Sequence, residues 1–321
     1  MKTADRPVVP QTAPPVPDAV GSRRDIVRGM VLMAIAMLVL PLMDGISKLL
    51  STQYGVTPGQ ITFGRFLIQA ALLAPIVVAV SGVAALVPKR WGVNLLRGAL
   101  MSIAVLLFFV TLRYMPIADA IAVFFIEPFI LTVLSVTVLK EQVGWRRMVA
   151  VLVGFIGAMF IVQPSYDVFG PVSLLPIGTA TLFAIYLLVT RMVATQDGPM
   201  TMQFASGVGG AVTLFAVLMI GNMFGITDVA APDIPDFGIR WALIFAIGAL
   251  ATVGHLMVVM AFKLAGASLL APFQYLEIVG ATALGYWMFG DFPGPWKWVG
   301  IAIIVSSGLY LFFRERQQAA D

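Results

Sequence analysis

The sequence predicts an all-α integral membrane protein in which ten transmembrane helices form two inverted repeats of five helices. Three observations support this prediction: the composition, the length of the apolar runs, and an internal repeat. Of 321 residues, 60% are hydrophobic and only 11% are charged, whereas about 25% of the residues in an ordinary soluble domain are charged. So few charges suit a protein whose surface faces lipid.

The apolar residues fall in long runs, of which Ile117–Leu139 and Trp241–Leu264 are examples. A bilayer core about 30 Å thick takes about 20 apolar residues per helix. Turn residues such as Thr57-Pro58-Gly59 separate the runs. The expected spans are residues 29–50, 58–80, 94–114, 117–139, 145–163, 172–193, 199–222, 240–264, 267–289 and 296–313. They leave no room for a soluble catalytic domain.

The positions of Lys and Arg predict how the chain is oriented. With the amino terminus in the cytoplasm, fifteen of the 20 Lys and Arg residues fall on the cytoplasmic side and five on the other. The longest non-cytoplasmic loop, near residues 223–239, contains three Asp residues and no basic residue. We therefore expect a multi-pass protein of a bacterial-type inner (plasma) membrane with both termini cytoplasmic.

A repeat relates the two halves of the chain at an interval of 150 residues, so that the fourth span matches the ninth. The matched pairs are Arg113 with Lys263, Glu127 with Glu277, Glu141 with Asp291 and, after one inserted residue, Trp145 with Trp296 and Gly157 with Gly308. Because each repeat has an odd number of helices, the second copy enters the membrane from the opposite side. Inverted repeats of this kind are typical of transporters.

The repeat divides the chain into two similar parts with a tail at each end. The first residues are rich in proline and poor in bulky apolar side chains, which is typical of disordered segments. The expected parts are a disordered cytoplasmic N-terminal tail (1–28), a first repeat (29–164), a second repeat (165–313) and a cytoplasmic C-terminal tail (314–321).

Several motifs in the first half resemble those of the drug/metabolite transporter superfamily, in its EamA-type branch of ten helices. They are Phe63-Gly64-Arg65-Phe66, Leu96-Arg97-Gly98-Ala99-Leu100, Ile117-Ala118-Asp119-Ala120, Glu127-Pro128, Lys140-Glu141, Trp145-Arg146-Arg147 and Gly154-Phe155-Ile156-Gly157. The resemblance covers nearly the whole chain and implies the same inverted arrangement. The first half is similar to members proposed to take up S-adenosylmethionine or riboflavin, while other branches export amino acids.

Glu127 and Glu277 are the first candidates for a functional site. An ionisable group inside the membrane costs about 2.5–3.5 kcal/mol on insertion scales. Each Glu lies ten residues into its span, about 15 Å deep, so the two carboxylates could line one cavity. We expect one of them to bind a proton or a substrate ammonium group. Pro128 cannot donate a backbone hydrogen bond, which frees the carbonyl of Phe124 beside Glu127; alternatively, it only kinks the helix.

Asp44 and Arg65 lie at matched depth, about 10 Å below the non-cytoplasmic surface, on consecutive antiparallel spans. This placement predicts a buried ion pair, which would be either a structural clamp or a gate that opens during transport. A structural role is favoured because an unpaired charge at that depth is strongly destabilising. Lys48, one turn beyond Asp44, is expected to extend to the membrane interface.

His255, the only histidine, is expected to be a hydrogen-bonded residue of the cavity, or else a polar contact between helices. Gln274 and Tyr275 lie within one turn of Glu277 and are further candidates for substrate contacts. We expect no metal site, because the chain has no Cys and His255 has no carboxylate four residues later. No cofactor is expected either.

The function predicted from these observations is secondary active transport of a small organic metabolite by alternating access, with protons as a possible coupling ion. The solute would be an amino acid, an amine or a vitamin-like compound, with uptake of S-adenosylmethionine or riboflavin as an alternative. A membrane scaffold or sensor is the alternative of a different class.

The sequence lacks a phosphate-binding loop and the clustered polar residues of an enzyme. The basic residues are scattered over helix ends, so we expect no nucleic-acid partner.

Overall fold

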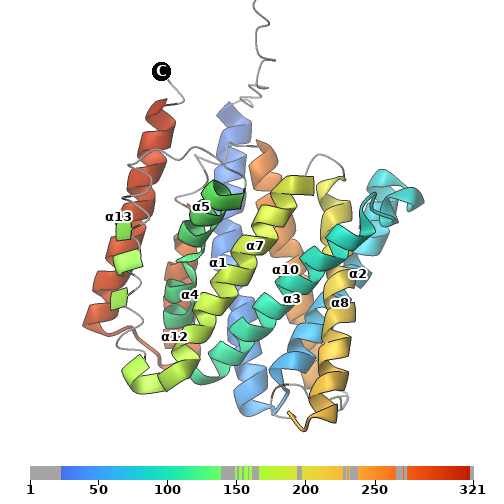
Figure 1. Cartoon of the computed structure of the whole chain (residues 1–321), viewed down its shortest axis with the longest axis horizontal. Helices are drawn as coiled ribbons and strands as arrows, with labels where there is room; N and C mark the ends of the chain where they lie inside the picture. The colour runs from blue at the N-terminus through green and yellow to red at the C-terminus, as the bar shows by residue number, and fades with distance from the viewer. Residues whose placement is uncertain are drawn as a thin grey trace, which may run out of the picture.

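The computed structural model of the chain is a bundle of helices (Figure 1). It describes residues 23–138, 149, 152–153, 155–157, 159–160, 166–193, 197–226, 229, 231, 238–264, 270 and 273–318. In these residues all regular secondary structure is helical, as predicted. The long helices of the described chain are α1 (Arg23–Gln53), α2 (Pro58–Ser81), α3 (Trp91–Tyr114), α7 (Leu175–Val193), α8 (Pro199–Met223), α10 (Ile239–Leu264) and α13 (Pro295–Gln318). The shorter elements are η1 (Val83–Leu86), α4 (Ile117–Phe124), α5 (Glu127–Val138), η2 (Gly170–Leu174) and α12 (Leu276–Phe289).

Seven segments of the described chain are long and apolar enough to cross a membrane, and α12 is a shorter apolar helix. The protein therefore passes through the membrane several times. The predicted span 145–163 lies largely outside the described residues, as do Glu141, Trp145 and Gly154. Helix α1 begins at Arg23, within the predicted N-terminal tail, and α13 continues to Gln318, within the predicted C-terminal tail.

Two spans that we predicted as continuous helices are interrupted in the structure. The span predicted at 117–139 consists of α4 and α5, with Phe125 and Ile126 in a turn between them. The span predicted at 267–289 likewise has a turn at Tyr275, directly before α12. At the first interruption, the missing N–H of Pro128 accounts for the break, since the carbonyl of Phe124 has no donor four residues later. Tight turns take over there, with Ile126 N–H donating to the Val123 carbonyl at 3.2 Å.

Close contact between backbones holds the outer helices together. A Cβ atom placed on Gly98 of α3 would lie 2.7 Å from the backbone nitrogen of Gly210 and 2.8 Å from the backbone of Gly209, both on α8. On the other side of α8, a Cβ on Gly207 would lie 3.2 Å from the backbone nitrogen of Ala70 on α2. Small residues allow this approach, which replaces the hydrophobic effect as the packing force inside a membrane.

Different helix ends lie at the two ends of the bundle. The beginning of α1 and the end of α13 lie at the same end of the bundle (Figure 1). The end of α1, the junction of α3 with α4 and the junction of α12 with α13 gather at the opposite end (Figure 1). The larger of the buried apolar clusters fills the region between these elements and includes Phe109, Ile121, Ile247 and Ile278.

The contact between α3 and α8 gives a first prediction. Replacing Gly98 with Ala should reduce stability by about 1–3 kcal/mol, because the added methyl group meets backbone atoms that cannot move independently. The midpoint of thermal unfolding in detergent measures this effect. Gly92→Ala is the matched control, since Gly92 is an exposed residue of the same helix with no atom within 4 Å of the added Cβ. Equal midpoints for the two variants would contradict this account of the packing.

Candidate functional site

Each interrupted helix places a glutamate directly after its interruption. Glu127 is the first residue of α5, and Glu277 is the second residue of α12. A carboxylate in the first turn of a helix is favoured by the unpaired N–H groups and the positive end of the helix dipole. Membrane transporters use helices that begin inside the bilayer to bind polar solutes and ions. The repeat found in the sequence therefore has a structural counterpart at these two glutamates.

The two interruptions meet in space. The rings of Phe125 and Tyr275, whose centroids are 5.5 Å apart, pack against each other. Their positions differ by 150 residues, the interval of the repeat. Both glutamates lie two residues beyond these rings.

Asp44 and Arg65 are the most deeply buried of the predicted site residues. Asp44 on α1 is 3% exposed and Arg65 on α2 is 1% exposed. The two side chains interact electrostatically, and Asp44 also interacts with Glu277. The described residues contain no direct ion pair between Asp44 and Arg65, however, and no hydrogen-bond partner for Oδ1 of Asp44 or for Nε and Nη1 of Arg65. The two side chains therefore interact electrostatically without a direct contact.

His255 lies next to this group. A Cβ on the neighbouring Gly254 would be 2.7 Å from Leu40, one turn before Asp44, so α10 packs tightly on α1 at this level. One ring nitrogen of His255, Nδ1, is 2.7 Å from the carbonyl of Ala251 and is assigned as the donor, since a carbonyl only accepts. His255 also interacts electrostatically with Arg65.

Electrostatic interactions connect four of the predicted site residues across α1, α2, α10 and α12: Asp44 with Arg65 and Glu277, and Arg65 with His255. The remaining candidates, listed by position, are Glu127, Pro128, Gln274 and Tyr275, which lie at the interruptions themselves. In the part of the chain that the structure describes, no group of three or more metal-binding side chains occurs.

Arg97 of α3 is a second buried arginine, and its environment differs from that of Arg65. It is 2% exposed, yet every guanidinium nitrogen donates a hydrogen bond. Nε donates to Thr190 Oγ1 at 2.8 Å, Nη1 to Asn94 Oδ1 at 2.8 Å and to the carbonyl of Met202 at 3.4 Å, and Nη2 to the hydroxyl of Tyr186 at 3.3 Å. Arg97 therefore joins α3, α7 and α8, whereas Arg65 keeps unused donors.

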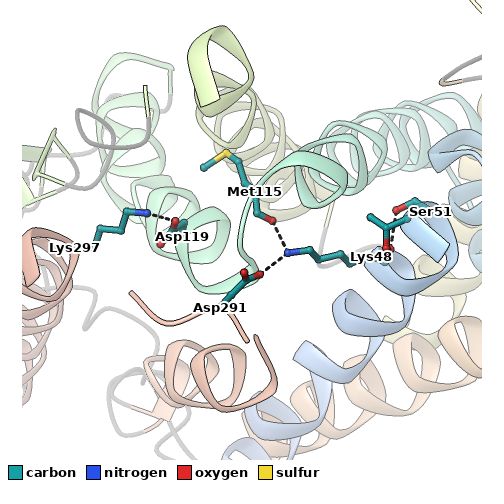
Figure 2. Close-up of polar contacts among 7 residues, drawn as sticks. Lys48, Ser51, Met115, Asp119, Asp291 and Lys297 are labelled. Carbon is teal, nitrogen blue, oxygen red and sulfur yellow. Dashed lines mark hydrogen bonds and ion pairs between the residues drawn. The ribbon is translucent and has the colours of Figure 1, made fainter. Parts of the chain in front are cut away.

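Two ion pairs at one end of the bundle were missed by the sequence analysis (Figure 2). Lys48 Nζ lies 2.7 Å from Asp291 Oδ2 and also donates to the carbonyl of Met115 at 3.2 Å. Lys297 pairs with Asp119, which is 2% exposed. We predicted that Lys48 extends to the membrane interface. In the structure its amine is instead bound by Asp291 and by the carbonyl of Met115. No sequence pattern joins residues that are 243 and 178 positions apart.

Local structure places the four charged groups of these pairs. Gly290, which caps α12, has φ +72°, a left-handed conformation that glycine adopts without strain. The chain turns there and directs Asp291 toward the end of α1 (Figure 2). Asp119 lies in the first turn of α4, where the helix dipole also favours its charge. The amine of Lys48 further contacts the ring of Phe289, 4.6 Å from its centroid.

Comparison with known proteins agrees with this architecture. A riboflavin transporter of Vibrio cholerae is 29% identical over 287 residues, which cover 88% of this chain and 92% of the relative. A S-adenosylmethionine uptake transporter of Rickettsia prowazekii is 28% identical over 278 residues, covering 87% and 90%. One crystal structure superposes with a TM-score of 0.61 at 17% identity, over 93% of this chain and 99% of the other.

The model of the EamA-like transporter family matches residues 27–163 and 171–313, which is most of the chain in two parts. These parts correspond to the two copies of the repeat that the interrupted helices display. The chain therefore belongs to the EamA-like transporter family.

Proposed function

We propose that the protein is a secondary carrier that moves a small organic solute by alternating access between two inverted repeats of five helices. The observation that carries this proposal is the meeting of two equivalent interrupted helices at Phe125 and Tyr275, each followed by a glutamate. A site beside the symmetry axis belongs equally to both repeats. It can therefore be opened to either side of the membrane by exchanging the conformations of the two halves.

The two ion pairs act as the gate of this carrier on one side. Each pair joins the first repeat to the second: Lys48 to Asp291, and Asp119 to Lys297. While both pairs are formed, the repeats are held together at this end, and a solute cannot leave there. The side chains of Lys48 and Asp291 are 12% and 29% exposed, so water can replace their contacts at moderate cost when the end opens.

The membrane topology is part of the same proposal. With ten spans and both termini in the cytoplasm of a bacterial cell, the gate lies on the non-cytoplasmic side. The first repeat then comprises residues 29–164 and the second 165–313, with tails at 1–28 and 314–321. With both ion pairs formed, the conformation described above is closed toward the outside.

The relatives support uptake as the direction and a metabolite as the cargo, since their names are riboflavin transporter and S-adenosylmethionine uptake transporter. Glu277 is the proposed binder of a cation, because it interacts with Asp44. This cation is either a coupling proton or a charged group of the solute. Glu127 occupies the equivalent position in the first repeat, and Gln274, Tyr275 and His255 are proposed as further contacts.

The gate can be tested with cysteines, because the chain contains none of its own. A Lys48→Cys/Asp291→Cys variant is reconstituted in liposomes and treated with a short thiol crosslinker. We expect uptake to fall at least tenfold on crosslinking and to recover with a cleavable reagent after reduction, because the repeats can no longer separate.

The matched control is Asp25→Cys/Arg28→Cys. These residues form an ion pair within α1 at 3.6 Å, so a crosslink between them leaves the repeats free to move and should not change uptake. Undiminished uptake by the crosslinked Lys48/Asp291 variant would contradict the gate.

Replacing Glu277 with Gln removes a charge without changing the size of the side chain. We expect uptake to fall at least tenfold, or to lose its dependence on an imposed proton gradient, because the proposed cation site is gone. Uptake at two external pH values with and without a gradient measures both effects. Asp25→Asn, at the beginning of α1, is the control and should behave like the wild type. A Glu277→Gln protein with normal, gradient-dependent uptake would exclude Glu277 from the mechanism.

A further inference from the structure

Asp44 and Arg65 are buried charged residues whose polar atoms are not all hydrogen-bonded in the structure. Both are almost completely buried, and both have polar atoms without a hydrogen-bond partner: Oδ1 of Asp44, and Nε and Nη1 of Arg65. A buried donor or acceptor without a partner costs about 1–3 kcal/mol, and more when it is charged. A buried polar atom without a protein partner marks a place where water, an ion or a ligand can supply one.

The chain can give every nitrogen of a buried guanidinium a hydrogen bond, as it does at Arg97. There, three side chains and a carbonyl accept hydrogen bonds from all the guanidinium nitrogens. The unused donors of Arg65 are therefore a property of its location rather than of buried arginines in this fold. Its guanidinium also packs over the ring of Phe66, 4.6 Å from the centroid, which fixes its plane and leaves two nitrogens available.

Close contacts between helices place α12 beside the segment of α1 that carries Asp44, and α10 beside Arg65 of α2. A Cβ on Gly280 of α12 would lie 3.3 Å from Pro41, one turn before Asp44. A Cβ on Gly248 of α10 would lie 3.4 Å from the carbonyl oxygen of Arg65. Glu277 is one turn before Gly280 and interacts with Asp44. One positive group and two acidic groups thus lie on helices that pack against one another, and the three groups interact electrostatically.

We propose that this region binds a zwitterionic solute, whose anionic group is bound by Arg65 and whose cationic group is bound by Asp44 and Glu277. The inference rests on the proposed function and adds the class of its cargo. The guanidinium of Arg65 is positively charged and has donors without a hydrogen-bond partner, and a carboxylate is an acceptor of the opposite charge. The cationic group of the solute donates a hydrogen bond to Oδ1 of Asp44, which has no partner in the structure.

A solute that is not zwitterionic would leave at least one of the three charged groups without a countercharge. A simple anion would pair with Arg65 but would face two acidic groups, and a simple cation would leave Arg65 unpaired in a medium of low dielectric constant. An uncharged solute would bring no countercharge to any of the three groups. Of the two solutes named for the relatives, S-adenosylmethionine has a carboxylate, an ammonium and a sulfonium group, whereas riboflavin is uncharged. The charges of Asp44, Arg65 and Glu277 therefore favour a solute that is charged like S-adenosylmethionine.

The test depends on two ligands that differ only in the anionic group, S-adenosylmethionine and its decarboxylated form. Binding to the purified full-length protein is measured by isothermal titration calorimetry with S-adenosylmethionine, its decarboxylated form, methionine and riboflavin. We expect S-adenosylmethionine to bind the wild type at least tenfold more tightly than the decarboxylated form, because only the former reaches Arg65 with a carboxylate. This comparison requires no variant and does not depend on the stability of a mutant.

Variants then assign the effect to Arg65. In Arg65→Gln the preference for the carboxylate should disappear, so that both forms bind equally within twofold, and Arg65→Lys should restore part of it. Arg97→Gln also removes a buried guanidinium and serves as the control, in which the preference should remain. A merely structural role of Arg65 would change both affinities together and leave their ratio intact.

Three results would overturn the inference: equal binding of the two forms by the wild type, no binding of any zwitterion in the set, or a preference that survives in Arg65→Gln. Failure of the proposed function is recognised separately. If the reconstituted protein transports riboflavin but none of the zwitterions, it remains a carrier and only the class of cargo is wrong.

Discussion

The cost of placing a charged group in hydrocarbon determines how this protein is built. The described helices contain few charged residues, and the structure treats them in three ways. Arg97 is fully hydrogen-bonded by neutral groups. Lys48, Asp119, Asp291 and Lys297 pair with one another at one end of the bundle. Asp44 and Arg65, by contrast, keep polar atoms without a hydrogen-bond partner, which distinguishes the proposed binding site from the charged residues around it.

The interrupted helices follow from the same constraint. An unpaired backbone group is tolerated at membrane depth only where it is buried in protein or lines a polar cavity. The break after Phe124 is buried in protein, since Phe125 and Ile126 belong to an apolar cluster against which Tyr275 packs. The two breaks meet at Phe125 and Tyr275, and a glutamate lies in the first turn of both α5 and α12. Tight packing of the other helices, as between Gly98 and Gly210, leaves this region as the part in which the backbone is least regular.

Much of this architecture could be predicted from the sequence, because it depends on local composition and on a repeat. Apolar runs locate the spans, and matching Glu127 with Glu277 identifies the equivalent central residues. The depth of Asp44 and Arg65 places them in one layer. The breaks were harder to predict. Pro128 indicates the first, and Pro272, five residues before Glu277, is a signal for the second that we did not use. The ion pairs of Lys48 and Lys297 could not be predicted, since they join distant segments whose approach is decided by the packing of the whole bundle.

Membership of the EamA-like transporter family and the symmetry of the site lead to one central claim, that a single site is exposed alternately to the two sides of the membrane. Counterflow in proteoliposomes tests this claim most directly. Vesicles loaded with unlabelled S-adenosylmethionine are diluted into a trace of the labelled compound, and a second set is examined with riboflavin. The account predicts a saturable, transient accumulation of label above its equilibrium level, which empty vesicles do not show, for at least one of these solutes. Uptake that rises linearly with concentration and is unaffected by internal solute would identify a channel and contradict the account.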